Sequence, residues 1–475
     1  MVTQCTSQQL TFEALGRREI VAGFDGGRMT SDGGALLLRE ADRFFNVTQR
    51  VADAFVDYRD PGRIEHDVKT LVAQRIFALA LGYEDLNDHD RLRDDPALAL
   101  ACGIDDVDGE RRARERDRGH ALAASSTLNR LELSLPAEAW KDRYKKVVAD
   151  HGALDRLLVA LFVESHGEPP GEIVLDLDAT DDPVHGDQEG KFFHGYYDHY
   201  CFLPLFIVCG EFILCCRLRT ADHGAADGSV DDLSRIVEQI RRAWPDTRIV
   251  VRGDADFGKN DIMVWCEAHD VDYVFGYRQN PRLNDMITRD LNKSRSRCLV
   301  SGKASRRYRD LRYRTRDSWA CERRVVAKAE WLPGLRGKNA RYVVTNISRK
   351  KVGARALYEH WYCARGDMEN RIKDQQLWLF SDRTSAHIMQ ANQLRMYFSA
   401  FAGFIIDIVR RVGLHGTDCA RWRVDTIRSR LFKLAGRVKK TVRRIRLSLA
   451  SAFPLQDVFA RTLVNLRTAA QAPPG

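Results

Sequence analysis

The segment EIVLDLDAT, residues 172–180, contains the pattern from which the fold is best worked out. An isoleucine, a valine and two leucines follow a Pro-Pro-Gly turn signal, and this pattern predicts a β-strand. Side chains alternate along a strand, so Asp176 and Asp178 lie on the same side of it. The strand therefore brings two carboxylates to its end, which is where ligands bind in open α/β sheets.

The segments that follow alternate between strand and helix patterns. Apolar runs of four to eight residues indicate strands, and apolar residues at spacings of three and four indicate helices. The predicted elements are strands at 199–210 and 211–220 joined by a turn near Gly210, a helix at 230–245, a strand at 247–258 that runs into a Gly-Asp loop, a helix at 260–270 and a strand at 271–278. This order predicts an α/β sheet with an antiparallel start and a parallel continuation.

Composition divides the chain into five regions. The first is mainly helical, because apolar residues recur at helical spacing behind Ser and Asp cap signals. Another is rich in arginine and β-formers, including SRCLVSGK, and predicts a small antiparallel sheet inserted in the fold. The regions are 1–168, mainly helical; 169–282 and 346–411, the two parts of the α/β core; 283–345, the β-rich insertion; and 412–475, a basic C-terminal region.

Positive charge is concentrated near the C-terminal end. The 475 residues carry a formal net charge of +9. Residues 421–446 contain eleven Lys or Arg and one Asp, a net +10, so the rest of the chain sums to about −1. Such a concentration favours a polyanion partner over generic solubility. The apolar pattern of this segment fits a hairpin or a helix, and both remain open.

The cysteines and the apolar runs indicate a cytoplasmic protein. Eleven cysteines occur without a CxxC pair, which fits a reducing compartment. The N-terminal residues lack a basic segment followed by an apolar one, the pattern of a signal peptide. The longest apolar stretch, 202–216, is interrupted by Gly210-Glu211 and is too short to span a membrane.

A helix predicted at 362–378, YCARGDMENRIKDQQLW, carries an unusual stripe. Tyr362, Arg365, Glu369 and Lys373 are spaced three, four and four residues apart, so they project from one side. With Asp178 and with Asp254 from the strand-end loop RGDADFG, Glu369 makes three carboxylates from three elements. Converging carboxylates repel one another unless hard divalent ions such as Mg²⁺ neutralise them. Taken singly, each acid also fits a turn, a cap or a solvated helix face.

The stripe matches a signature of a known family. The chain resembles bacterial insertion-sequence transposases of the DDE class, in the group with the pattern Tyr-x2-Arg-x3-Glu-x6-Lys. Tyr362, Arg365 and Glu369 match that pattern, whereas Gln376 stands where the Lys is expected. Lys373 lies one turn earlier on roughly the same face and is the candidate substitute.

The two aspartate motifs extend the resemblance over roughly residues 20–465. The family's first Asp precedes x-Thr, which favours Asp178 over Asp176. Its second Asp lies in a Gly-Asp-x-x-Phe setting, which favours Asp254 over Asp256. The resemblance implies a ribonuclease-H-like catalytic core with the β-rich insertion between Asp254 and the Glu. It also implies that the Tyr and Arg of the signature hold the DNA end.

The resemblance implies a Mg²⁺-dependent DNA transposase. Asp178, Asp254 and Glu369 are then the catalytic metal ligands for two ions, with Mn²⁺ as a substitute. The implied partners are the inverted-repeat ends of its element, target DNA and a second copy of the chain on DNA, with the protein cytoplasmic and nucleoid-associated in a bacterium. The alternatives are a related nuclease without strand transfer and an inactive, transposase-derived DNA-binding protein. The expected DNA-binding residues are Tyr362, Arg365, Lys373, Arg437, Lys439, Lys440, Arg443 and Arg444.

Two further segments have both a functional and a structural interpretation. SSTLNRLEL, residues 125–133, is either a helix for a DNA groove or a short, well-capped surface helix. The helical region around it is the expected DNA-end binding region. Trp319 and Trp331 in the insertion either stack on a flipped base, as aromatics do in similar transposases, or pack in the core.

Overall fold

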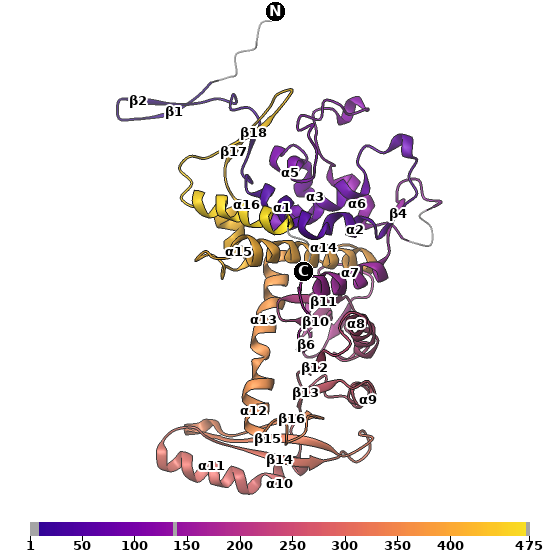
Figure 1. Ribbon diagram of the computed structural model, residues 1–475, viewed down its shortest axis with the longest axis vertical. Helices are drawn as coiled ribbons and strands as arrows, with labels where there is room; N and C mark the ends of the chain where they lie inside the picture. Colours follow the sequence, from indigo (N-terminus) through magenta and orange to yellow (C-terminus); the bar gives the residue numbers. More distant parts are fainter. Residues whose placement is uncertain (1–8, 136–139, 472–475) are drawn as a thin grey trace, which may run out of the picture. The chain divides into compact units, whose positions relative to one another are not determined.

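The computed structural model describes residues 9–135 and 140–471, which form a mixed α/β structure (Figure 1). Its contacts divide the chain into two units. One comprises the residues up to 150, residues 378–380 and the residues from 401, and the other comprises 151–377 and 381–400. The N-terminal helical region thus shares a unit with the basic C-terminal region. No helix within the described ranges is long and apolar enough to cross a membrane.

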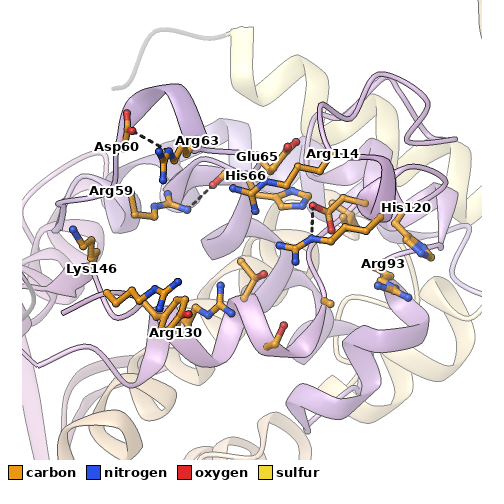
Figure 2. A pocket seen from close by; sticks show the side chains of 18 residues that line it. Arg59, Asp60, Arg63, Glu65, His66, Arg93, Arg114, His120, Arg130 and Lys146 are labelled. Atoms are coloured by element: carbon orange, nitrogen blue, oxygen red, sulfur yellow. Dashed lines mark hydrogen bonds and ion pairs between the residues drawn. The ribbon is translucent and has the colours of Figure 1, made fainter.

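The first unit is built around a helix that is almost completely enclosed. Twelve of the residues of α3 (Val68–Leu81) are buried, and its Arg75 forms a salt bridge of 2.8 Å with Glu132 of α6 (Ser125–Glu132). This unit also contains a cavity lined by charged side chains (Figure 2). Its other elements are β1 (Leu10–Leu15), β2 (Arg18–Ala22), β3 (Met29–Thr30), α1 (Ala35–Phe45), α2 (Val47–Ala52), β4 (Phe55–Asp57), η1 (Pro61–Arg63), η2 (Leu86–Asp88), α4 (His89–Leu92), α5 (Pro96–Ala101), η3 (Glu115–Asp117), β5 (Val147–Ala149), η8 (Val409–Gly413), α15 (Val424–Ile427), η9 (Arg428–Phe432) and α16 (Gln456–Gln471).

The basic segment contains both of the structures that its pattern allowed, because its first half is helical in α15 and η9 and its second half enters a hairpin. Strand β17 (Gly436–Lys440) pairs antiparallel with β18 (Ile445–Leu449), and β3 completes a three-stranded sheet. The alternation of buried and exposed side chains explains why this part of the segment forms a strand, because Val438 is buried while Arg437 and Lys439 are exposed on the opposite face. Part of the positive charge of the basic segment points into the protein and not into solvent, since buried Arg428 donates to the carbonyls of Ala80 and Leu79.

The second unit contains an eight-stranded sheet in the order β11-β10-β6-β12-β13-β16-β15-β14. Its first five strands have the directions expected from the sequence: β10 lies between β11 and β6 and is antiparallel to both, while β6, β12 and β13 are parallel. The prediction of an α/β sheet with an antiparallel start and a parallel continuation is therefore confirmed. These strands are β6 (Glu172–Ala179), β10 (Leu205–Cys209), β11 (Phe212–Arg217), β12 (Arg248–Gly253) and β13 (Asp272–Tyr277).

The predicted insertion extends this same sheet. Strand β16 (Gly337–Thr345) pairs antiparallel with β13, and β15 (Arg323–Leu332) and β14 (Ser305–Tyr313) follow outward. SRCLVSGK was wrongly predicted as β, because its first six residues belong to helix α11 (Thr288–Ser301), which follows α10 (Pro281–Met286). The buried residues of α11 are Leu291, Ser294 and Cys298, a helical spacing that outweighs the local β-formers.

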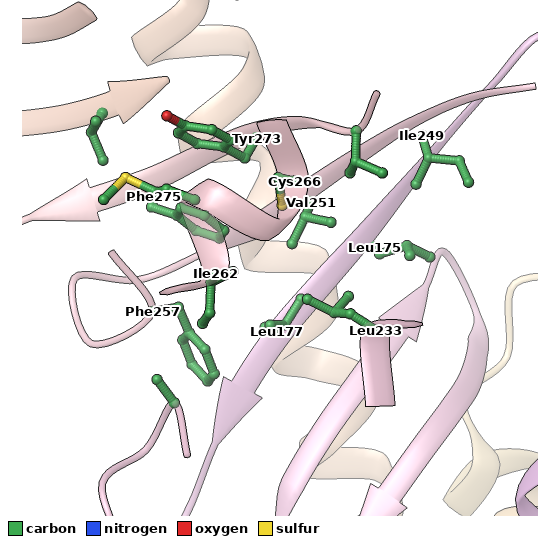
Figure 3. Packing of buried hydrophobic residues seen from close by; sticks show 14 of the residues in the cluster. Leu175, Leu177, Leu233, Ile249, Val251, Phe257, Ile262, Cys266, Tyr273 and Phe275 are labelled. Carbon is green, nitrogen blue, oxygen red and sulfur yellow. The ribbon is translucent and has the colours of Figure 1, made fainter. Parts of the chain in front are cut away.

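The two faces of the sheet bury different clusters. Leu175, Leu177, Ile249 and Val251 pack with α8 (Ser229–Ala243) and α9 (Asn260–Ala268) on one face (Figure 3). The other face buries Val250 and Val274 with Leu357 and Tyr358. Because side chains alternate, the even-numbered Asp176, Asp178 and Arg252 belong to this second face.

A continuous helical segment covers that second face, and its hydrogen bonding is irregular. It comprises α12 (Ala354–Ala356), a π-helical turn η5 (Leu357–Tyr362), a 3₁₀ turn η6 (Cys363–Arg365), α13 (Gly366–Lys373) and a second π-helical turn η7 (Asp374–Trp378). The predicted helix at 362–378 exists, but these turns replace a regular α-helix at both of its ends. π-Turns inside helices are frequent at functional sites. The remaining elements of the unit are α7 (His151–Glu164), β7 (Asp182–Pro183), β8 (Phe192–His194), β9 (His199–Phe202), η4 (Gly334–Arg336) and α14 (Met389–Ile408), whose last residues belong to the first unit.

Candidate active site

Parallel pairing places two acidic residues side by side at the ends of β6 and β12. The register pairs Asp176 with Arg252 and Leu177 with Gly253. Asp178 is the next residue of β6, and Asp254 directly follows β12. The two candidate aspartates are therefore neighbours at the carboxyl ends of these adjacent strands. Both are half-buried.

Glu369 approaches the same place from helix α13. Its charge and that of Asp254 both act on the Asp178 carboxyl, so the three predicted acids share one electrostatic environment. The pKa of Asp178 is raised to about 7, mainly by burial; Asp254 and Glu369 also raise it, whereas the guanidinium of Arg365 lowers it. Across the described residues, no three His, Cys, Asp or Glu side chains are grouped closely enough to hold a metal ion. The three acids thus lie near the same strand ends, but their carboxylates are not in contact with one another.

Arg365 forms an ion pair with Asp178. Its Nη2 lies 3.3 Å from Oδ1 of Asp178, and the Arg365 side chain is only 11% exposed. Its Nε is buried without a hydrogen-bond partner. A buried donor without an acceptor is costly. The guanidinium is therefore held in the site with part of its hydrogen-bonding capacity unused.

Tyr362 points its hydroxyl at the backbone that carries Asp254. A Cβ atom at Gly276 of β13 would lie 2.6 Å from this hydroxyl and 3.0 Å from the carbonyl carbon of Asp254. Gly276 is thus required by the close approach of the loop backbone, because a Cβ atom would also lie 2.8 Å from the backbone nitrogen of Ala255, which cannot move aside as the end of the Tyr362 side chain can. Burial raises the pKa of Tyr362, while Arg365 lowers it and Asp254 raises it.

A buried ion pair fixes the helical segment above the strand ends, and the sequence alone had not indicated it. Asp176, the rejected acid of the first motif, accepts from Nη2 of Arg252 at 2.6 Å. Arg252 also donates to the carbonyls of Trp361 at 2.6 Å and Ala364 at 3.4 Å. These carbonyls flank the turn that carries Tyr362 and precedes Arg365. The sequence carries no local signal for this pair, because it arises from the parallel register of two strands that are distant in the sequence.

The other predicted residues of this helix contribute differently. Lys373 is exposed on α13, and no ion pair joins it to another described residue. Gln376, at the position where a Lys was expected, donates to the carbonyl of Asp181 at 3.3 Å. It therefore ties η7 to the loop that follows Asp178. The alternative acid Asp256 pairs with Arg278, and its N–H donates to Oδ1 of Asp254 at 2.8 Å.

The predicted basic residues of the tail belong to the first unit. Lys440 bonds Asp106 at 3.2 Å. Arg437, Lys439, Arg443 and Arg444 are exposed and lack ion pairs within the described ranges. They are available to bind anions.

Trp319 is a core residue. It is 4% exposed and packs edge-on against Tyr277, with the ring centroids 4.9 Å apart. Base stacking requires an accessible ring face, so this geometry does not fit that interpretation. Trp331 is half-buried, with the guanidinium of Arg295 lying 5.3 Å from its ring centre.

The chain belongs to the transposase DDE domain group 1 family, whose model matches residues 12–471. It is a transposase. No curated protein matches the sequence.

We expect Arg252→Lys to slow DNA cleavage by about 10- to 100-fold while the protein stays folded and binds DNA normally. Lysine keeps the charge beside Asp176 but cannot also hold two carbonyls, and small displacements of reacting groups have effects of this size. Cleavage rate, DNA affinity and thermal melting of the variant test this.

Arg248→Lys is the matched control. Arg248 lies on the same strand and bonds Asp272 of the neighbouring strand at 2.6 Å, at the end remote from the acids. Equal loss of cleavage in both variants would show that Arg252 has only a general structural role.

Proposed function

We propose that this transposase cleaves DNA at the ends of an insertion-sequence element and joins the 3′ ends to target DNA. The observation that carries the proposal is the register of β6 and β12, which makes Asp178 and Asp254 neighbours beneath the helix of Glu369. The strand order and directions of β11-β10-β6-β12-β13 support a ribonuclease-H-like catalytic core. A nuclease without strand transfer would use the same acids, so a strand-transfer assay separates the two functions.

The chemistry of the three acids suits two divalent metal ions, which their side chains would hold only after moving closer together than they lie here. Carboxylate oxygens are the ligands that Mg²⁺ and Mn²⁺ take, and the mutual repulsion seen at Asp178 is what a cation relieves. Asp178, Asp254 and Glu369 would hold the metal. Mg²⁺ there would activate an attacking oxygen and stabilise the leaving oxygen in phosphodiester chemistry.

Arg365 has a second role in this proposal. In the absence of DNA it balances the charge of Asp178. When DNA is present, we infer that its planar fork turns to the phosphate next to the cleaved bond, which satisfies the buried Nε as well. Tyr362 beside it would bond the same phosphate, and exposed Lys373 would contact the flanking backbone.

The partners follow from the reaction. Joining two element ends to a target requires that both ends be held together, so we propose a homodimer on DNA in the bacterial cytoplasm, associated with the nucleoid. The N-terminal helical region would bind the inverted-repeat ends. The hairpin β17–β18 would contact backbone phosphates.

We expect Asp178→Asn, Asp254→Asn and Glu369→Gln each to reduce cleavage by about a thousandfold or more while DNA binding persists. Each amide keeps the shape of the side chain but is a poor ligand for a hard cation. Cleavage in Mg²⁺, in Mn²⁺ and after chelation, together with DNA affinity, measures the effect.

Asp231→Asn is the control for loss of one negative charge. Asp231 is exposed in the first turn of α8, on the opposite face of the sheet. An Asp254→Asn protein with full cleavage activity would refute the assignment of that residue.

We expect Arg365→Lys to fold normally and to cleave DNA about tenfold more slowly or worse, since a charge-assisted bidentate contact is worth on the order of 1.5–3 kcal/mol. If Arg365 serves only as the partner of Asp178, Arg365→Lys should keep most activity and Arg365→Ala should lower the melting temperature. Cleavage rates and melting curves of both variants decide between the two roles. An active and stable Arg365→Ala protein would contradict both.

We expect replacing Arg443 and Arg444 with Gln to weaken binding of duplex DNA of any sequence. The slope of log affinity against log salt should fall in magnitude by about 0.9 for each lost phosphate contact. Arg241 and Arg242, an adjacent pair on α8 engaged with the His269 carbonyl and with Glu238, provide the matched Gln variant. Equal slopes for the two double variants would mean that the hairpin cations are only solvated.

A further inference from the structure

The cavity of the first unit has an excess of positive charge. Its volume is about 740 Å³, and its lining contains eight Lys or Arg against three Asp or Glu (Figure 2). With the histidines neutral, the formal net charge is therefore +5. The lining comes from several segments of residues 59–146 and includes none of the candidate acids of the second unit. So many like charges around one hollow repel one another unless an anion enters.

Most of these cations form no ion pair with another described residue. Arg59 is bound by Asp57 at 2.7 Å and Arg63 by Asp60 at 3.3 Å. Arg116 lies 3.7 Å from Asp117. The other five form no ion pair within the described ranges; they are Arg93, Arg114, Arg130, Arg143 and Lys146. The cavity thus contains five cations whose charge is not balanced by a carboxylate of the described residues.

Arg93 is the most constrained of these. It follows α4, and its Nε is buried without a hydrogen-bond partner. Nδ1 of His66, another lining residue, is buried without a partner as well. Burial, with the charge of nearby Arg112, lowers the pKa of His66 to about 4, so this ring is neutral at physiological pH. The wall of the cavity therefore contains two buried nitrogen atoms that could still form hydrogen bonds to a ligand.

Helix α6 explains how part of the wall is oriented. It buries Leu128, Leu131 and Glu132 and leaves Arg130 exposed to the cavity. The guanidinium carbons of Arg130 and Arg143 each lie 5.1 Å from the ring centre of Tyr144. Contact with an aromatic ring orients a guanidinium before any ligand arrives. This is the SSTLNRLEL segment, which the sequence left as either a DNA-contacting or a plain surface helix.

We propose that this cavity of the first unit binds successive backbone phosphates of one DNA strand. Guanidinium forks suit phosphate oxygens, and such contacts position DNA without reading its bases. The number of free cations exceeds the need of a single phosphate group, which favours a strand over a mononucleotide. The inference rests on the proposed function, because that function makes DNA the polyanion partner.

The test is a variant with Arg114, Arg130 and Lys146 all changed to Gln. None of these three side chains makes a hydrogen bond or ion pair to another described residue, so the variant should fold, as its melting temperature will show. Binding of a short duplex of unrelated sequence is measured across a salt series in the presence of a chelator, so that cleavage plays no part. We expect about tenfold weaker binding or more, and a salt slope smaller in magnitude by about 0.9 per lost contact.

The control variant loses the same charge elsewhere. Arg43, Arg242 and Arg355 are 61%, 74% and 77% exposed, and each pairs with a Glu on its own helical segment. Changing all three to Gln should leave binding nearly unchanged. A second pocket variant, Arg114→Lys with Arg130→Lys, keeps the charge and should retain most of the affinity.

Two results would overturn the inference. One is a pocket variant that binds the duplex as tightly as the control variant does. The other is tight binding of AMP by the wild type that the pocket variant loses while duplex binding stays intact, which would make the cavity a mononucleotide site. Either result leaves the proposed function standing, because that depends on the cleavage assays of Asp178, Asp254 and Glu369.

Discussion

The buried ion pair between Asp176 and Arg252 is the constraint on which the rest of the candidate site depends. Both residues lie within β-strands, so the pair is fixed by the register of β6 and β12. Arg252 then uses its remaining donors on two carbonyls of the helical segment. A single guanidinium thereby couples the two strands that carry the aspartates to the helix that carries Glu369. Breaking one side of such a buried pair leaves an uncompensated charge, a change that typically costs about 3–5 kcal/mol.

Irregular hydrogen bonding in that helical segment is consistent with this anchoring. Carbonyls that accept from Arg252 belong to Trp361 at the end of a π-turn and Ala364 in a 3₁₀ turn. A regular α-helix would place the stripe of Tyr362, Arg365 and Glu369 by its own geometry. Here the sheet determines where the turn between Tyr362 and Arg365 lies, because Arg252 of β12 donates hydrogen bonds to the carbonyls on either side of that turn.

Much of this arrangement could be predicted from local sequence. Alternation in EIVLDLDAT placed Asp176 and Asp178 on one face, and the order of elements predicted the first five strands of the large sheet. The limits are equally physical. Nothing local shows that Arg252 and Asp176 pair, since their partnership arises from parallel register between strands distant in sequence. Residues 296–301 are β-formers by propensity yet lie in α11, where packing of Leu291, Ser294 and Cys298 prevails. The close approach of Tyr362 to Gly276 likewise needed the three-dimensional structure.

Electrostatics separate the part of the surface that would carry out the reaction from the parts that would attract DNA. A cluster of carboxylates repels a polyanion, and the charges of Asp254 and Glu369 already add to the effect of burial in raising the pKa of Asp178. Outside residues 421–446 the chain has almost no net charge. Long-range attraction for DNA must therefore come from local concentrations of cations, and the structure contains two in the first unit, at the tip of β17–β18 and in the cavity beside α6. At both places, several cations form no ion pair with another described residue. Much of the affinity for DNA should thus come from the first unit, while the second unit carries the acids that the reaction needs.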